Sequence, residues 1–132
     1  MQMIRHRDNS EGVPDDFPDW VFSYWTKQKM QSRDWKTRMK ALRSAASAFI
    51  AKETVRNCIF SHKGHRCYIC GREANQIDHR IPVSQFSSDE FLDYRDLNNY
   101  DNLFPVCGEC NIHKAGRLEI AVHRAEHAAP RL

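Results

Sequence analysis

Apolar residues recur every three or four positions along a stretch in the first half of the chain, from about residue 32 to residue 57. The stretch contains no glycine or proline, so no residue in it forces a helix to stop. Spacing of three and four places the apolar side chains on one face of a helix. The sequence therefore predicts one long amphipathic helix. Its apolar stripe consists of Trp35, Met39, Leu42, Ala46, Phe49 and Ile50.

Upstream of this predicted helix the pattern changes twice. Residues 1–16 are polar and show no apolar period, which predicts a flexible N-terminal arm. Residues 17–28 are rich in aromatic side chains, and Asp16 followed by Pro18 is typical of the first turn of a helix. We expect a short helix here that packs a small aromatic platform into the core. One face of it would carry Trp20, Val21, Tyr24, Trp25 and Gln28.

The second half of the chain predicts two strands and a final helix. Apolar and polar positions alternate over residues 76–83, which predicts a short strand. Residues 84–99 are polar and acidic and predict a loop with one helical turn, and residues 102–106 predict the returning strand. A helix is expected to begin at Cys110 and to continue, after one break, to residue 127. This order predicts a small α+β fold. The inward-facing residues of the first strand would be Ile77, Ile81 and Val83.

Basic residues are concentrated just before the first cysteine pair. The chain carries a net charge of +3, but residues 27–66 hold eleven Lys and Arg against two Asp and Glu, a net +9. Such a block is typical of proteins that contact a phosphate backbone, although a solvated helix face gives the same pattern. We expect DNA to contact a basic ridge along one side of the long helix. The basic ridge consists of Arg33, Lys36, Lys40 and Arg43.

The expected compartment decides how the cysteines are interpreted. No apolar run near the N-terminus resembles a signal sequence, and no segment approaches the roughly 20 apolar residues that cross a bilayer. We therefore expect a cytoplasmic protein that does not contact a membrane. In a reducing compartment, the four cysteines that stand in two Cys-x-x-Cys pairs are expected to bind metal rather than to form disulfides. The fifth, Cys58, is expected to be a small buried apolar residue.

The two cysteine pairs predict a structural zinc site. A gap of two residues lets both thiolates of a pair reach one ion, and four sulfur ligands complete a tetrahedral shell. Because this shell is closed, the zinc cannot activate water, and catalysis would need a second, open metal position. The zinc ligands would be Cys67, Cys70, Cys107 and Cys110.

A different zinc pairing also matches the spacing. Cys107 and Cys110 precede His123 and His127 at the intervals of a classical two-cysteine, two-histidine zinc finger. This pairing would leave the first cysteine pair without partners. It would also place a lysine where such a finger has an aromatic core residue.

Four short motifs follow one another over about residues 65–117: Cys-x-x-Cys, Asp-His, Asn-Leu and Cys-x-x-Cys-Asn-x-x-Lys. This order resembles that of the Cys-containing HNH endonucleases, a branch of the ββα-metal (His-Me finger) nucleases. The resemblance implies a ββα-metal core stapled by the zinc. It also implies that His79 is the general base and that Asn102 braces the loop. Asp78 and Asn111 would then be ligands of the catalytic ion.

One position departs from the pattern of many members of that family, which have histidine after the last cysteine. Here this residue is Asn111, and His113 follows two residues later as an alternative metal ligand or phosphate contact. Residues 111 and 113 lie roughly 200° apart on a helix, so both are not expected to face one ion. Mg²⁺ or Mn²⁺ prefers oxygen ligands such as those of Asp78 and Asn111. Neutral His79 can accept a proton from water near pH 7.

The motifs and the charge distribution together predict three parts: a flexible arm (1–16), a helical basic extension (17–60) and an HNH nuclease domain (61–132). The expected activity is metal-dependent hydrolysis of DNA that leaves a 5′-phosphate and a 3′-hydroxyl, without an organic cofactor. The chain could act as a homodimer, and the resemblance points to a prokaryotic or phage-encoded, restriction-related enzyme. The alternative is a non-catalytic four-cysteine zinc module that binds nucleic acid or protein. Further DNA contacts are expected from Arg80, Lys114 and Arg117.

Overall fold

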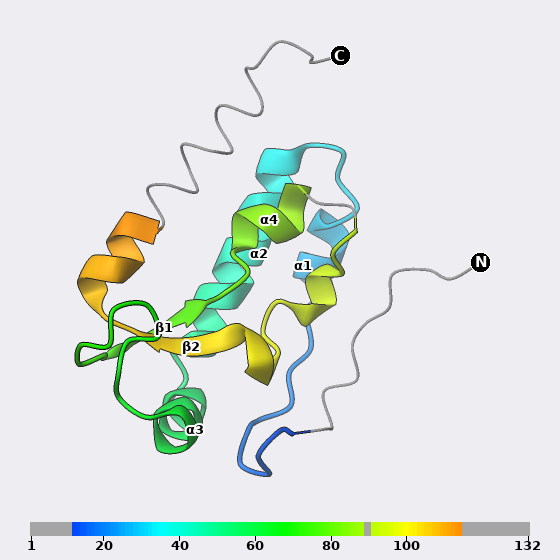
Figure 1. Ribbon diagram of the computed structural model, residues 1–132. Coiled ribbons are helices and arrows are strands. Elements are labelled where there is room, and N and C mark those ends of the chain that lie inside the picture. Colours follow the sequence, from blue (N-terminus) through cyan, green and yellow to red (C-terminus); the bar gives the residue numbers. More distant parts are fainter. Residues whose placement is uncertain (1–11, 89–90, 115–132) are drawn as a thin grey trace.

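The computed structural model describes residues 12–88 and 91–114. Helices and a two-stranded antiparallel sheet form a small α+β fold, as the sequence predicts (Figure 1). Residues 108–114 are also helical and follow the second strand directly. Two short 3-10 turns, Tyr94–Asp96 and Tyr100–Asn102, lead into the second strand. The remaining elements are α1 (Tyr24–Lys29), α2 (Trp35–Ile50), α3 (Glu53–Lys63), β1 (Gln76–His79), α4 (Val83–Ser88) and β2 (Leu103–Val106).

The sheet pairs β1 with β2 so that Gln76 lies opposite Val106 and His79 lies opposite Leu103. The predicted returning strand is confirmed by β2. The first predicted strand is correct only in its first half, because β1 ends at His79 and Val83 already belongs to α4. Pro82 lies between them and has no N–H group to donate to a strand ladder.

The prediction of a single long helix over residues 32–57 is wrong, because the structure has two helices there. Helix α2 is capped by Ala51, and Lys52 adopts an extended conformation (φ −67°, ψ 133°) before α3 begins. The break allows Phe49 from α2 and Ile59 from α3 to enter the same hydrophobic cluster. Tertiary packing therefore sets the break, since no glycine or proline marks it in the sequence.

The prediction of a short aromatic helix that begins near residue 17 is also wrong, because the helix begins at Tyr24. Residues 17–22 are not helical, and α1 starts only after Ser23, whose hydroxyl accepts a hydrogen bond from the Thr26 backbone N–H at 3.2 Å. In this non-helical segment Phe17 and Phe22 are buried in two different hydrophobic clusters, and Trp20 contacts both clusters. Because the segment crosses from one cluster to the other, its buried side chains do not have to recur at helical spacing.

Trp20 packs against the core, but the other apolar residues of the predicted aromatic platform do not. Tyr24 is 66% exposed, Trp25 is 73% exposed and Val21 is 86% exposed. The rings of Tyr24 and Trp25 contact each other edge to face, with centroids 5.7 Å apart. These side chains therefore form part of the surface of the molecule.

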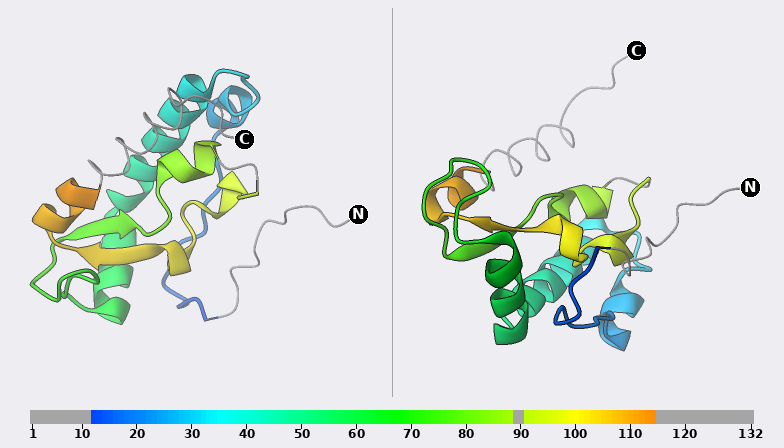
Figure 2. Two further views of the ribbon diagram at one scale, coloured as in Figure 1. Left: turned by 45° about the horizontal axis from the view of Figure 1, so that its top comes forward. Right: turned by 60° about the horizontal axis from the view of Figure 1, so that its bottom comes forward.

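Two hydrophobic clusters hold the elements together, and each takes residues from both sides of residue 60. The first joins α3 to the sheet, and Lys63 adds two hydrogen bonds to the backbone carbonyls of Tyr100 (2.7 Å) and Leu103 (2.6 Å). The second joins α2 to α4, which lies against it in both views of Figure 2. Leu42 and Leu97, both fully buried, belong to this second cluster.

Several predictions fall on residues that the structure does not describe. These include most of the arm (residues 1–11), the helix beyond residue 114, the DNA contact Arg117 and the alternative zinc ligands His123 and His127. Within the described ranges, no helix has the length and apolar character needed to cross a membrane.

Candidate functional site

The four cysteines of the two pairs lie together. The first pair stands on a tight turn, in which the Gly71 N–H donates to the Cys67 carbonyl at 2.9 Å. Gly71 has a φ of 79°, a conformation that residues other than glycine disfavour. In the second pair, Cys107 directly follows β2 and Cys110 lies in helix 108–114. All four sulfur atoms are within 4.8 Å of one another.

The surroundings of the sulfur atoms favour a bound dication. Burial alone would raise the pKa of Cys67, but backbone N–H groups of Cys107, Cys70 and Ile69 donate to its sulfur and lower the pKa to about 6. A hydrogen bond with Cys107, and then burial, raise the pKa of Cys110 to about 12. Four thiolates in one place repel one another unless a cation balances them. The cluster could therefore hold a metal ion and is compatible with structural zinc.

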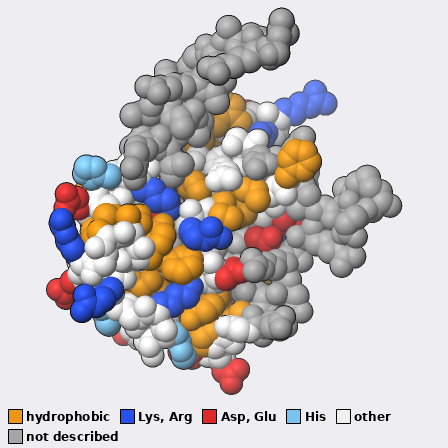
Figure 3. Space-filling view, in the orientation of Figure 1, with side chains coloured by type: hydrophobic (Ala, Val, Ile, Leu, Met, Phe, Trp, Pro, Cys, Tyr) orange, Lys and Arg blue, Asp and Glu red, His pale blue; other side chains and the backbone are white. Residues whose placement is uncertain are grey.

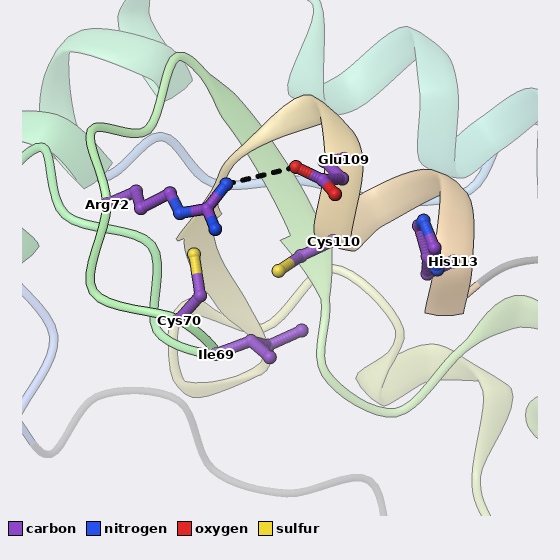
Figure 4. Close-up of a pocket in the computed structure, with 6 residues that line it drawn as sticks. All are labelled: Ile69, Cys70, Arg72, Glu109, Cys110 and His113. Atoms are coloured by element: carbon purple, nitrogen blue, oxygen red, sulfur yellow. Dashed lines mark hydrogen bonds and ion pairs between the residues drawn. The ribbon is translucent and has the colours of Figure 1, made fainter.

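The pocket at Cys70 and Cys110 is also lined by His113. Cys70 and Cys110 lie close together in Figure 4, below an exposed ion pair between Arg72 and Glu109 (3.1 Å). The structure thus places His113 beside the cysteines, whereas the neighbouring Asn111 contacts the sheet.

A polar site lies between β1 and helix 108–114. The Lys114 ammonium donates to Oδ2 of Asp78 at 2.5 Å and to the backbone carbonyls of His79 (2.9 Å) and Arg80 (3.0 Å). The Tyr68 hydroxyl donates to the same Asp78 oxygen, also at 2.5 Å. Burial, and then this hydrogen bond, raise the pKa of Tyr68, so its hydroxyl stays protonated and donates. Lys114 was predicted to contact DNA, but here it fastens the end of β1 to the helix.

Asn111 belongs to the same polar site. Its Nδ2 donates to Oε1 of Gln76 at 2.9 Å, which leaves its Oδ1 as the atom available to a cation. Gln76 and Asp78 stand two residues apart on β1 and so face the same side of the strand. Asn111 and Lys114 stand three residues apart on the helix and also share a face. The predicted ligands Asp78 and Asn111 therefore both lie between β1 and helix 108–114.

His79 faces the opposite side of β1 from Asp78, as consecutive strand residues do. It is buried, and its Nε2 lies 2.7 Å from Oδ1 of the buried Asn98. A carboxamide oxygen only accepts, so Nε2 carries the proton and Nδ1 keeps the free lone pair. Burial lowers the pKa of His79 below its usual value. The hydrogen bond with Asn98 and the negative charge of Asp78 partly offset this effect, and the positive charge of Lys114 adds to it. The imidazole is therefore neutral near pH 7 and can act as a base through Nδ1.

Asn102 connects the two ends of the loop between the strands. Its Oδ1 accepts from the Ile81 N–H at 2.7 Å, and its Nδ2 donates to the carbonyls of Ile81 (3.2 Å) and Leu97 (2.8 Å). Because Leu97 directly precedes Asn98, this side chain also fixes the segment that holds His79. A bracing role for Asn102 stays a prediction, and these are the contacts through which it would act.

Replacing Asn102 with alanine is expected to destabilise the protein by about 1–3 kcal/mol, because buried backbone groups lose their partners. The exposed Asn75→Ala variant is the matched control and should change the free energy of unfolding by no more than about 0.5 kcal/mol. Urea unfolding of both variants measures the difference. Equal stabilities would show that Asn102 does not brace the loop.

The basic ridge is exposed along its whole length. Lys36, Lys40 and Arg43 lie on α2, and Arg33 lies in the turn before it. Arg80, the remaining described DNA-contact candidate, is also exposed. Figure 3 shows Lys and Arg side chains interspersed with hydrophobic ones over one face of the molecule.

Three partners of the predicted site residues were missed by sequence reasoning: Tyr68, Gln76 and Asn98. Gln76 could have been found, because it stands two residues before Asp78 in a predicted strand. Tyr68 lies inside the first cysteine pair, and only the fold brings it to Asp78. Asn98 lies in a stretch predicted as a polar loop, where no spacing rule links it to His79.

Comparison with family models, with curated proteins and with solved structures finds no match to this chain. Function is therefore argued from the chemistry of the site.

Proposed function

We propose that this chain is a metal-dependent HNH endonuclease of the ββα-metal type with a four-cysteine zinc site, which hydrolyses phosphodiester bonds in DNA. The observation that supports it most strongly is the polar site between β1 and helix 108–114, which contains the side chains of both Asp78 and Asn111. These oxygen donors suit a hard dication. The proposed core consists of β1, β2 and that helix, with the four cysteines fixing the helix to the turn before β1.

The residues divide into ligands, base and positioning groups. Oδ2 of Asp78 already accepts hydrogen bonds from Tyr68 and Lys114. The ligands proposed for the ion are therefore Oδ1 of Asp78 and Oδ1 of Asn111. Mg²⁺ or Mn²⁺ held there would stabilise negative charge on the phosphate and the leaving oxygen. His79 accepts the proton of the attacking water through Nδ1, and Asn98 holds its tautomer.

The proposal is tested by incubating the purified protein with linear, supercoiled, modified and branched DNA in the presence of Mg²⁺ or Mn²⁺. Cleavage of at least one substrate is expected, and end labelling should detect a 5′-phosphate and a 3′-hydroxyl. If all four substrates stay intact while the protein still binds DNA, the chain is the non-catalytic zinc module instead. The comparison also identifies the preferred form of DNA.

Reversing the charge of the basic ridge is expected to lower the affinity for DNA. It should also make this affinity fall less steeply as the salt concentration rises. In a Lys36→Glu, Lys40→Glu, Arg43→Glu variant, the slope of log K against log salt should fall by about 0.9 for each phosphate that the protein no longer neutralises. A charge-preserving variant, Lys36→Arg, Lys40→Arg, Arg43→Lys, is the control and should keep the wild-type slope. Fluorescence anisotropy at several salt concentrations measures both. An unchanged slope in the reversed variant would exclude the ridge from the interface.

A further inference from the structure

A second group of metal-ligating side chains is separate from the four cysteines and from the proposed catalytic site. It consists of Asp16, Cys58 and His62, whose ligand atoms all lie within 4.8 Å of one another. His62 Nε2 is 2.8 Å from Asp16 Oδ1, and Cys58 Sγ is 3.5 Å from the same oxygen. The sequence predicted Cys58 to be a small buried apolar residue, and no motif pointed to this group.

The fold brings these residues together in a simple way. Cys58 and His62 are four residues apart on α3, so their side chains lie one above the other on the same face. Asp16 comes from the segment before Phe17, where the Phe17 N–H donates to the Pro14 carbonyl at 3.0 Å. Phe17 and Cys58 belong to the same hydrophobic cluster, which keeps the segment close to α3.

The three donor atoms lie close to the positions that one ion needs. Zinc lies about 2.0–2.3 Å from nitrogen, oxygen and sulfur ligands, so neighbouring donors of a tetrahedral shell are about 3.3–3.8 Å apart. The 3.5 Å separation lies in that range, and the 2.8 Å separation between the exposed Asp16 and His62 side chains would have to widen by about 0.5 Å on binding. Sulfur and imidazole donors favour a transition-metal ion such as Zn²⁺ over Mg²⁺ or Ca²⁺.

Charge and exposure also suit a bound zinc ion. One thiolate and one carboxylate would balance a dication, with the imidazole neutral. Cys58 is fully buried, whereas the side chains of Asp16 and His62 are 56% and 41% exposed. Solvent can therefore deliver the ion, and a water molecule can complete a tetrahedral shell. Burial raises the pKa of the Cys58 thiol to about 11, so ion binding has to displace this proton.

We propose that Asp16, Cys58 and His62 bind a zinc ion that fastens the segment before α1 to α3. The same three groups can also form a hydrogen-bonded chain without metal, in which the thiol and the imidazole both donate to the carboxylate. The two arrangements predict different metal contents. If the three residues bind zinc, the protein holds one equivalent of metal more than the four paired cysteines account for.

The test is titration of the folded protein, with zinc already bound to the four paired cysteines, with Co²⁺, read by sulfur-to-cobalt absorption, together with zinc content by mass spectrometry. The wild type is expected to bind one equivalent more than Asp16→Asn or His62→Gln. Both replaced residues are largely exposed, so these variants should fold, and Asp16→Asn keeps a hydrogen-bond partner for His62. His65→Gln is the control, because His65 is exposed and stacks on Phe60, and it should match the wild type.

Two results would overturn the proposal. One is a wild type that binds no metal beyond the four-cysteine site when Co²⁺ or Zn²⁺ is in excess. The other is an Asp16→Asn or His62→Gln variant that binds as much metal as the wild type. Neither result depends on DNA cleavage, so the site and the proposed nuclease activity are tested independently.

Discussion

Replacing His79 with alanine is expected to slow DNA cleavage about 10²–10⁴-fold, the range that a positioned general base contributes. The imidazole is neutral near pH 7 because burial lowers its pKa, and Asn98 directs the proton to Nε2. Removing the ring therefore removes the lone pair that would accept a proton from water. Single-turnover cleavage with saturating Mg²⁺ or Mn²⁺ measures this step without product release.

The loss must be separated from unfolding, because His79 is buried and its removal leaves Asn98 without its partner. The His79→Gln variant keeps more of the volume and is expected to be equally inactive. Zinc content and a cooperative thermal transition above the assay temperature show that each variant is folded. His65→Ala changes an exposed histidine and should cleave at the wild-type rate. Wild-type cleavage by folded His79→Ala would contradict the role of His79 as base.

Removing one zinc ligand is expected to abolish cooperative folding of the described core. In Cys107→Ser, the tie between the Cys67–Cys70 turn and the end of β2 is lost, and helix 108–114 no longer has a fixed position. Zinc binding is worth about 10–16 kcal/mol in zinc-finger peptides. That is comparable to the total stability of about 5–15 kcal/mol that is usual for a domain. The near-ultraviolet circular dichroism spectrum and zinc content measure the loss.

A control at the same surface separates the metal from its surroundings. Arg72→Gln breaks the exposed ion pair with Glu109 but leaves all four sulfur atoms in place. Exposed ion pairs contribute about 0–1 kcal/mol, so this variant should keep its zinc and its fold. A strong chelator should reproduce the Cys107→Ser result in the wild type, and added zinc should reverse it. A Cys107→Ser protein with wild-type stability and no zinc would show that the metal does not hold the fold.

The sequence predicted those parts of the fold whose residues form a recognisable pattern within a short stretch of chain. The two cysteine pairs have the spacing of a four-cysteine metal site, and the structure brings their sulfur atoms together. Alternation around Ile77 and the short run after Asn102 identified the two strands, since each has a buried face.

The parts that could not be predicted depend on contacts between distant segments. The apolar stripe ends at Ile50, but no glycine or proline interrupts the stretch up to residue 57. Only the packing of α3 against β2 explains the break at Lys52. Phe17 and Phe22 are separated because they belong to different clusters, which their spacing does not indicate. In the site, Asn98 reaches His79 across nineteen positions of sequence. Such pairs become visible only after the chain has folded.

The central claim is that this chain cuts DNA with a second metal ion, distinct from its structural zinc. The most direct measurement is cleavage of supercoiled plasmid by zinc-loaded protein, with and without added Mg²⁺ or Mn²⁺, with zinc content determined on the same sample. Nicked or linear plasmid is expected only when the second ion is added, while the zinc content stays constant. An intact plasmid under every condition, or cleavage that needs no added ion, would contradict the claim.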